Sequence, residues 1–406
     1  MRVLFLGSIA NCATAIVRAL VRAGHVVDLA SCTRRGRQRV THVFVSKYVR
    51  RRFTLPMPHE KPQAFRDGLL ELLLRNGPYD VLLPFNYAQN LAVARMRDEL
   101  APHTSVAVGP IHALQHLHEK DRLYDIAETI GIAAPRRIKY TDWDDLRAKV
   151  DCFPLVLKAR RGEGAHGLRF VRTMDELEQV FHAMQAVIPT FPELQDFTHP
   201  IVQEYVPGNV HDVGYLFCKG KMRMAISQRR NLMYPLQGGP GVDVVTTQEP
   251  DLVEQGRALL ERVGWHGVCQ VEFKRDSRDG SPRLLDVNPR FWGTLDVAIQ
   301  AGANFPAKLC ELAARGDTTE QYEYRVGLRY VNLLPLMLFT LCQSRGERSA
   351  RLNDIRDVLR GRVHCEIELR DFRPHLWILS SALWKIVRQH KIVFAPNPLS
   401  AKPVAL

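Results

Sequence analysis

The sequence lacks the long apolar runs that would place the protein in a membrane. Its longest near-continuous apolar runs, residues 333–342 and 376–387, fall well short of the ~20 residues that a membrane-spanning helix needs. The apolar run at residues 3–6 stops at Gly7-Ser8 and is shorter than the core of a signal peptide, about 7–15 residues. We therefore expect neither a polytopic membrane protein nor a cleaved leader.

The sequence also lacks clustered cysteines. The nearest two of its eight, Cys12 and Cys32, lie 20 positions apart, so there is no C-x-x-C motif and no zinc-ribbon spacing. This scatter is typical of small buried side chains in a reducing compartment, and we expect a cytoplasmic protein. With 46% hydrophobic and 24% charged residues the composition is that of a globular protein, and 406 residues predict two to three domains.

Negative charge is scarce in two segments of this basic chain, whose net charge is +13. Residues 31–59 contain no acidic residue but eight basic ones: Arg34, Arg35, Arg37, Arg39, Lys47, Arg50, Arg51 and Arg52. We interpret this stretch as a solvated basic face, with an acidic-substrate patch and a nucleic-acid site as alternatives. Residues 375–391 predict a basic amphipathic helix with two tryptophans. Packing on the catalytic lobes, or a dimer contact, is favoured there over a membrane surface.

Residues 1–109 alternate between strand and helix patterns. Strands are predicted at 2–6, 26–30 and 80–83, and helices at 11–23, 65–75 and 89–100. This order predicts an open parallel sheet covered by helices. Asp28 follows Gly7 at the spacing of a dinucleotide site. However, residues 8–12 lack the second and third glycines of that fingerprint, so we do not favour such a site.

A glycine-rich loop lies in the second part of the chain, after a predicted helix at 114–131. Gly162, Gly164 and Gly167 follow a predicted strand at 153–159, and the next residues, 168–171, again read as a strand. A strand–loop–strand unit of this kind can fold over phosphates, with Lys158 at its entry to neutralise charge. The alternative is a plain flexible hairpin.

The clearest chemical pattern is an acidic β-hairpin formed by residues 268–274 and 282–290. Antiparallel pairing about residue 279 puts 272 opposite 286 and 270 opposite 288. One face then carries Gln270, Glu272, Asp286 and Asn288, and the other carries Val271, Phe273, Leu285 and Val287. Facing carboxylates favour a bound cation, and oxygen ligands of this kind suit Mg²⁺. The alternative is a solvated outer face.

The order of these motifs resembles the ATP-grasp superfamily over roughly residues 110–315. The segments that carry the resemblance are Lys120, Lys158 with the glycine loop, Gln203-Glu204-Tyr205-Val206, Glu272 and Asp286-x-Asn288-Pro-Arg290. They are similar to carboxylate–amine ligases of uncharacterised substrate. The implied fold is α/β, with α+β character in the ATP-binding lobes. Its parts are an open-sheet domain (1–109), two lobes (110–192 and 193–325) and a mainly helical extension (326–406).

The resemblance assigns roles to individual residues. Lys120 and Lys158 would contact ATP, and Gly162, Gly164 and Gly167 would cover its β- and γ-phosphates. Gln203, Glu204, Tyr205 and Val206 would form the hinge, with backbone groups of the last two reading adenine and Glu204 reading its amino group. Glu272, Asp286 and Asn288 would bind Mg²⁺, or Mn²⁺ in its place, and Arg290 would contact the γ-phosphate or an acyl phosphate. The bridging ligand, usually glutamate in this family, is Asp286 here, and the ribose ligand is left open between Asn209 and Asp212.

The implied reaction is ATP-dependent ligation of a carboxylate to an amine or similar nucleophile, both small molecules. The alternatives are phosphoryl transfer, bicarbonate-dependent carboxylation, or a nucleotide- or nucleic-acid-binding regulator without catalysis; nucleic acid is not favoured. Arg229-Arg230, before the loop at 237–241, predicts a site for the substrate carboxylate, with a surface arginine pair as the alternative. A homo-oligomer is left open.

Overall fold

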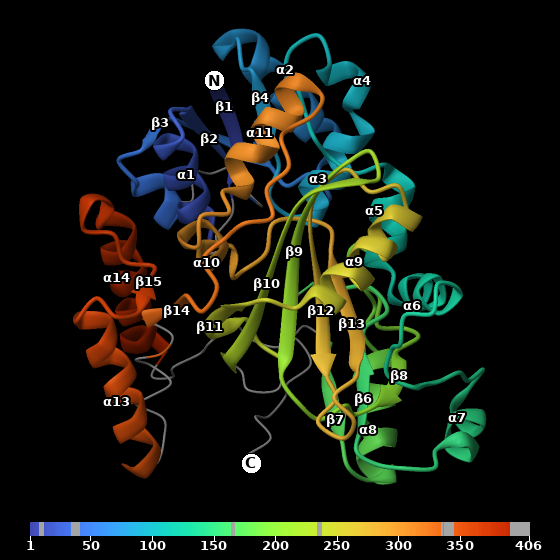
Figure 1. Cartoon of the computed structure of the whole chain (residues 1–406). Helices are drawn as coiled ribbons and strands as arrows, with labels where there is room; N and C mark the ends of the chain where they lie inside the picture. The colour runs from blue at the N-terminus through green and yellow to red at the C-terminus, as the bar shows by residue number, and fades with distance from the viewer. Residues whose placement is uncertain are drawn as a thin grey trace.

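A computed structural model describes residues 1–7, 12–33, 41–163, 167–233, 238–333, 336 and 345–389. Several predicted features lie outside these residues: Gly164, Gln237, Lys391, and Arg34, Arg35, Arg37 and Arg39 of the basic stretch. The described residues build three β-sheets with helices on their faces (Figure 1). No helix in the described part of the chain combines the length and apolar character needed to cross a bilayer.

The N-terminal sheet is parallel throughout, as the alternating strand and helix patterns predict. Its strand order is β3 (Val49–Pro56), β2 (Val26–Thr33), β1 (Arg2–Gly7) and β4 (Val81–Leu83). The flanking helices are α1 (Cys12–Arg22), α2 (Pro62–Asn76), α3 (Tyr87–Arg95) and α4 (Arg97–Leu100). Val3 and Phe5 of β1 share a buried cluster with the apolar side chains of α1, which fixes the helix on the sheet.

Asp28, the acidic residue at dinucleotide-site spacing, is buried within this sheet. Its carboxylate accepts hydrogen bonds from Arg50 Nη2 (2.7 Å), Arg2 Nη2 (3.1 Å) and Tyr79 Oη (2.8 Å). These contacts hold the pKa of Asp28 at about 2 despite its burial. Because its oxygens are already occupied, Asp28 is not placed to bind a ribose.

A small antiparallel sheet forms the next unit. Its order is β5 (Arg137–Ile138), β8 (Ile201–Glu204), β6 (Leu155–Lys158) and β7 (Arg169–Val171). Helices α7 (Trp143–Lys149) and α8 (Met174–Gln185) cover it through a separate apolar cluster. The strands β6 and β7 flank the glycine-rich loop, so the predicted strand–loop–strand unit is present.

The helix predicted at 114–131 is two helices, α5 (Ile111–His118) and α6 (Lys120–Thr129). The break falls at Glu119, whose backbone is extended (φ −87°, ψ 107°). The buried Glu119 carboxylate binds Arg160 (2.8 Å) and Arg161 (2.7 Å), and the Lys120 amide donates to the Arg160 carbonyl (3.0 Å). These contacts with the segment after β6 replace the helical hydrogen bonds and place Lys120 beside the small sheet.

The large sheet is the centre of the molecule. Its strand order is β13 (Pro282–Asn288), β12 (Gly267–Arg275), β9 (Val210–Cys218), β10 (Lys221–Met233), β11 (Gly241–Thr247), β14 (Arg329–Val331) and β15 (His364–Cys365). Helices α9 (Pro250–Arg262), α10 (Leu295–Gln300) and α11 (Phe305–Arg315) pack on it (Figure 1). Every residue of β9 is buried, and Gly214 lets the Trp292 ring approach so closely that a Cβ would lie 2.4 Å from it.

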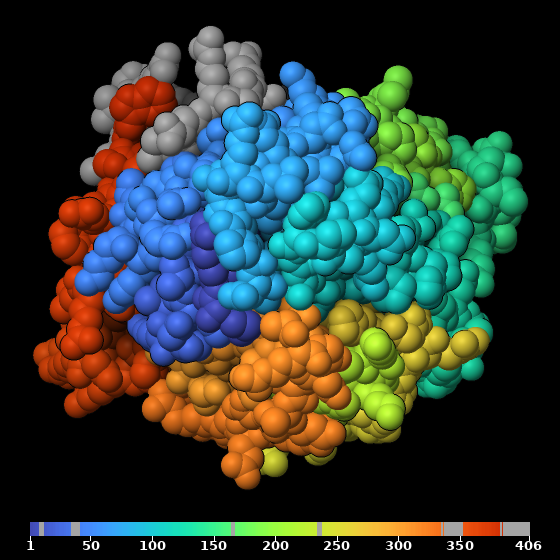
Figure 2. All heavy atoms as spheres, turned by 90° about the horizontal axis from the view of Figure 1, so that it is seen from above, coloured from blue at the N-terminus to red at the C-terminus, as the bar shows by residue number. Residues whose placement is uncertain are grey.

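The C-terminal part contains α13 (Arg345–Leu359), a short 3₁₀ helix η2 (Leu369–Asp371) and α14 (Arg373–Gln389). It lies against the N-terminal domain, as the red and blue surfaces show when the molecule is viewed from above (Figure 2). The buried Asp371 carboxylate accepts from Arg18 Nε of α1 (3.2 Å), Ser46 Oγ (2.8 Å) and the Lys47 amide (3.0 Å). The η2–α14 part of the extension therefore packs on the N-terminal domain, and not on the catalytic lobes that the sequence analysis favoured.

Candidate active site

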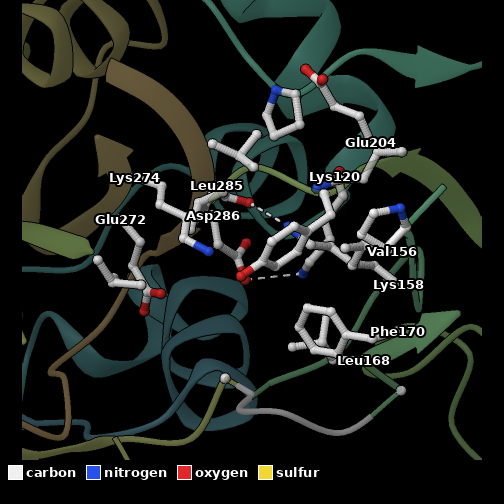
Figure 3. A pocket seen from close by; sticks show the side chains of 18 of the residues that line it. Lys120, Val156, Lys158, Leu168, Phe170, Glu204, Glu272, Lys274, Leu285 and Asp286 are labelled. Carbon is white, nitrogen blue, oxygen red and sulfur yellow. Dashed lines mark hydrogen bonds and ion pairs between the residues drawn. The ribbon is translucent and has the colours of Figure 1, made fainter. Parts of the chain in front are cut away.

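A cavity of about 320 Å³ opens between the small sheet and strands β12 and β13 of the large sheet. Its lining includes these predicted site residues: Lys120, Lys158, Gly162, Gly167, Gln203, Glu204, Tyr205, Val206, Arg230, Glu272 and Asp286. Figure 3 shows Glu272 and Asp286 on one wall and Lys158 with Phe170 on the other. The predicted residues Asn288 and Arg290 lie further along β13 and just beyond it.

Two lysines, one from α6 and one from β6, contact strand β13 of the acidic hairpin. Lys158, the last residue of β6, donates from Nζ to the Tyr124 hydroxyl and to the Leu285 carbonyl, each at 3.2 Å. Burial lowers the pKa of Lys158, while the charges of Asp286 and Glu272 oppose that shift. Lys120, the first residue of α6, forms an ion pair with Asp286 at 3.2 Å. The cavity thus holds cations and carboxylates that face one another.

The register of the acidic hairpin is the one predicted, since Gln270 pairs with Asn288 and Glu272 with Asp286. The assignment of Leu285 to the apolar face was wrong. Phe273 pairs with Leu284, so Leu285 is the extra residue of a β-bulge. Leu284 is fully buried instead, and Leu285 lines the cavity, where its carbonyl accepts from Lys158.

The oxygen-bearing side chains of this hairpin contact one another and nearby cations. Asn288 Nδ2 donates to Glu272 Oε1 (2.8 Å) and to Gln270 Oε1 (3.1 Å). Arg230 also pairs with Glu272 (2.9 Å). Within the described residues no three His, Cys, Asp or Glu side chains are grouped to hold a metal. The predicted metal ligands are instead two carboxylates, Glu272 and Asp286, and one amide, Asn288. Hard oxygen donors in this number fit a site that a substrate phosphate completes.

Arg230 is a buried bridge. It donates from Nε to Asp212 Oδ2 (2.8 Å) and from Nη2 to Asp212 Oδ1 (2.6 Å), while also pairing with Glu272. Asp212 is fully buried, and burial raises its pKa to about 6 although Arg230 acts in the opposite direction. The alternative of a surface arginine pair is therefore excluded for Arg230, whose guanidinium is occupied by Asp212 and Glu272. Because both carboxylate oxygens of Asp212 accept from Arg230, Asp212 is not placed to bind a ribose.

The residues predicted to form the hinge, 203–206, line another part of the cavity. Glu204 accepts from the Arg136 amide (3.0 Å) and pairs with Arg278 (3.3 Å), so its carboxylate is partly occupied. Gln203 is buried, and its Oε1 has no hydrogen-bond partner. The Tyr205 ring meets Phe170 edge-on, with centroids 5.8 Å apart. An apolar, aromatic end with an unpaired amide oxygen suits a flat heterocycle.

Sequence reasoning missed Lys274, Phe170 and Glu163. Lys274 lies two residues after Glu272 on the same face of β12, a position that the period of two could have revealed. Its Nζ lies 4.6 Å from the Tyr205 ring centroid, and burial with the Lys158 charge lowers its pKa to about 8. Phe170 follows the glycine loop on β7 and lines the cavity.

Glu163 connects the glycine-rich loop with two other parts of the molecule. Its carboxylate accepts from Arg290 Nε (2.9 Å) and from the Tyr87 amide at the start of α3 (3.3 Å). Arg290 Nη2 also donates to Asn288 Oδ1 (2.9 Å). Arg290 is thereby held at the meeting point of the loop, the acidic hairpin and the N-terminal domain.

Comparisons with known proteins place this geometry in a family context. The profile of the family described as ATP-grasp in the biosynthetic pathway with Ter operon matches residues 196–334. Carnosine synthase 1 of Gallus gallus is 28% identical over 164 residues, which are 35% of this chain and 16% of that protein. This chain spans no more than 66% of the length of the curated relatives compared.

Two solved structures share the arrangement of elements. The L-amino acid ligase from Bacillus licheniformis has a TM-score of 0.59 and 15% identity, covering 79% of this chain and 74% of that one. The biotin carboxylase domain dimer of the Hydrogenobacter thermophilus 2-oxoglutarate carboxylase, in complex with MgADP, ADP and bicarbonate, has a TM-score of 0.62. It is 15% identical, covering 81% of this chain and 73% of that one. The chain therefore has the ATP-grasp fold, and the resemblance to the ATP-grasp superfamily is confirmed.

Proposed function

We propose that the protein is an ATP- and Mg²⁺-dependent ligase that activates a carboxylate as an acyl phosphate for attack by an amine. One observation carries the proposal: Lys120 and Lys158 face Glu272 and Asp286 across a single cavity. Cations alone would suit any anion, and carboxylates alone would suit any metal. Their combination suits a phosphate chain that arrives together with a divalent cation.

The charge balance of the cavity favours a polyanion. The cationic side chains that line it are Lys120, Lys158, Arg172, Arg230 and Lys274, and the acidic ones are Glu204, Glu272 and Asp286. The excess of positive charge in a partly enclosed space attracts a triphosphate more strongly than it would in open water. The aromatic end beside Tyr205 is then the place for the adenine ring.

The donor set of the hairpin fits a magnesium ion, with manganese as a replacement of similar ligand preference. Glu272, Asp286 and Asn288 would hold it. When bound, the metal would neutralise phosphate charge and orient the triphosphate. The present partners of these side chains, Arg230 and Lys120, would pair with phosphate oxygens instead.

The reaction itself needs positioning and charge stabilisation more than a nucleophilic side chain. A carboxylate oxygen of the substrate attacks the γ-phosphorus, the bond to the β–γ bridging oxygen breaks, and ADP leaves. The amine nitrogen then attacks the acyl carbon, and the carbon–oxygen bond to the phosphate breaks. Phosphate leaves with the electron pair, and the nitrogen loses a proton to water. Lys158 and Arg290 would stabilise the charge that develops on the transferred group.

The comparisons support the ligase reading without deciding it, because ligases and carboxylases share this fold. An L-amino acid ligase and a carnosine synthase are similar to this chain, and so is a carboxylase domain solved with bicarbonate.

The test uses the purified full chain with Mg-ATP and pools of carboxylic acids, each with and without amines, bicarbonate or hydroxylamine. We expect ADP release that needs an acid together with an amine, and a hydroxamate when hydroxylamine replaces the amine. ADP release that depends on bicarbonate instead would establish carboxylation, and a stable phosphorylated product would establish phosphoryl transfer. Absence of turnover with every pool, together with nucleic-acid binding in a gel shift, would establish a regulator.

A further inference from the structure

Asp296 is a buried carboxylate without a cationic partner. It lies in the first turn of α10 and is 9% exposed. It accepts from the Tyr330 hydroxyl (2.7 Å) and, at 3.5 Å, from the Gln300 amide. In the part of the chain that the structure describes, no Lys, Arg or His nitrogen lies within 4.0 Å of it. Buried carboxylates are normally paired with a cation, so this one requires an explanation.

Two adjoining cavities open onto Asp296, apart from the candidate active site. Their volumes are about 80 Å³ and 320 Å³, and they share Ala15, Arg18, Asp296, Glu366 and Ile367 in their lining. They lie where α1 and α10 meet the C-terminal elements β15 and α14 (Figure 1). The larger cavity gives access from the surface, and the smaller one is more apolar.

The neighbouring arginines, Arg18 and Arg22, make their direct contacts with other groups. Arg18 donates from Nε to the Asp371 carboxylate (3.2 Å), from Nη2 to the Asp371 carbonyl (2.7 Å) and from Nη1 to the Glu366 carbonyl (2.9 Å). Arg22 pairs with Glu368 (2.6 Å). Both guanidinium groups are thus held by the C-terminal extension. Burial raises the pKa of the Asp296 carboxyl, and the charges of Arg18 and Arg22 oppose that shift from a distance, so a cation in direct contact would stabilise the charged form.

A second polar atom in the smaller cavity also lacks a partner. The Thr14 side chain is 3% exposed, and its hydroxyl oxygen makes no hydrogen bond. It lines the same cavity as Asp296, so an acceptor and a negative charge are available together. The walls around them include the aliphatic side chains of Ala15, Leu333 and Ile378, and the polar residues Arg18, Glu366 and His375 also line this cavity.

We propose that this cavity binds the ammonium group of a small aliphatic primary amine. The ammonium pairs with the Asp296 carboxylate and donates a hydrogen bond to Thr14 Oγ1. The aliphatic body packs on Ala15, Leu333 and Ile378. An ammonium group supplies the missing cation and three donors, and the apolar walls exclude larger polar groups.

Binding is tested with isobutylamine at pH 7, without nucleotide, by titration calorimetry or ligand-observed NMR. Isobutanol, which has the same shape and no charge, is the comparison ligand. We expect Asp296→Asn to weaken isobutylammonium binding at least tenfold and Thr14→Val to weaken it less. Tyr330→Phe, which removes a hydrogen bond but leaves the carboxylate, should retain binding within about threefold. Circular dichroism confirms that each variant is folded.

Equal affinity of isobutylammonium for wild type and Asp296→Asn, or equal affinity of wild type for isobutanol, would overturn the site. Should Asp296→Asn not fold, the ratio of wild-type affinities for isobutylammonium and isobutanol decides the same question. A separate measurement isolates the proposed function: carboxylate-dependent scrambling of ¹⁸O within ATP, which needs no amine. Scrambling without amine binding would overturn the amine site alone. Amine binding without scrambling by any acid would overturn the ligase proposal alone.

Discussion

Lys120 and Asp286 form an ion pair of 3.2 Å that joins the start of α6 to the acidic face of β13. Arg230 and Glu272 form a second pair across the same cavity, at 2.9 Å. The cations proposed for the phosphates thus pair with the carboxylates proposed for the metal. We infer that Mg-ATP binding exchanges these pairs. The phosphates would then pair with Lys120 and Arg230, and the metal would bind Asp286 and Glu272.

The first prediction concerns Lys120. Lys120→Met should weaken Mg-ATP binding by about 10- to 100-fold, since a hydrogen bond to a charged group contributes about 1.5–3 kcal/mol. Titration calorimetry with a non-hydrolysable ATP analogue measures this loss. Lys149→Met is the matched control, because Lys149 pairs with Asp145 on the exposed surface of α7. Unchanged affinity in Lys120→Met would contradict the exchange of ion pairs.

A second prediction addresses the metal ligands. Asp286→Asn should reduce Mg-ATP turnover by on the order of 100-fold or more, because even neighbours of metal ligands cost 10–100-fold. Asp279→Asn, in the exposed turn of the same hairpin, should keep full turnover. Steady-state ADP release at several Mg²⁺ concentrations provides the measurement. Turnover retained by Asp286→Asn at low Mg²⁺ would remove this carboxylate from the metal site.

Arg230 carries a prediction on stability. Arg230→Met leaves the buried Asp212 carboxylate unpaired and should lower the free energy of unfolding by about 3–5 kcal/mol. The double variant Arg230→Met/Asp212→Asn removes both charges and should recover part of that loss. Urea unfolding followed by circular dichroism compares the variants. A double variant less stable than Arg230→Met would show that the pair is not the source of the effect.

The sequence predicted the hairpin register because a period of two and a turn at Asp279-Gly280 leave few ways to pair the strands. It did not predict the bulge at Leu285, since a bulge depends on packing against neighbouring strands. The break at Glu119 has a similar cause. Helical periodicity runs through 114–131, and contacts with Arg160 and Arg161 override it.

The candidate site was predictable in part for the same reason. Motif order brought Lys120, Lys158 and the acidic hairpin together, because each follows from a short local pattern. The partners of Arg230 and Glu163 were hidden, since they join segments far apart in the chain. Lys274 was overlooked although its spacing from Glu272 placed it on the same face of β12.

Lys274 makes nucleotide affinity depend on pH. Its ammonium is charged below a pKa of about 8 and neutral above it, with Lys158 adding to the lowering by burial and Asp276 opposing it. Wild-type affinity for Mg-ATP should therefore fall by up to about tenfold as pH rises from 7 to 9. Lys274→Arg should flatten this fall, and Lys274→Met should bind weakly at both pH values. A wild-type profile identical to that of Lys274→Arg would exclude Lys274 from nucleotide binding.

Gly167, at the end of the glycine-rich loop, has both a positive φ and close neighbours around its Cα. Gly131 has the positive φ without the close neighbours and serves as the matched control. The φ of Gly167 is +77°, and an added Cβ would lie 2.6 Å from the Phe197 ring and 2.8 Å from Ala159 Cβ. Gly131 has φ +74° with open space around it. Gly131→Ala should therefore lose about 1–2 kcal/mol of unfolding free energy from backbone strain alone.

Gly167→Ala should lose more than Gly131→Ala, because Phe197 and Ala159 are buried and must move. The Gly167 carbonyl also accepts from the Ala159 amide (3.1 Å), next to Lys158. Displacing it should shift Lys158 and weaken binding of a non-hydrolysable ATP analogue, whereas Gly131→Ala should bind as wild type. Equal stability losses in the two variants, with unchanged nucleotide affinity, would mean that the fit of Gly167 between Phe197 and Ala159 does not position the loop.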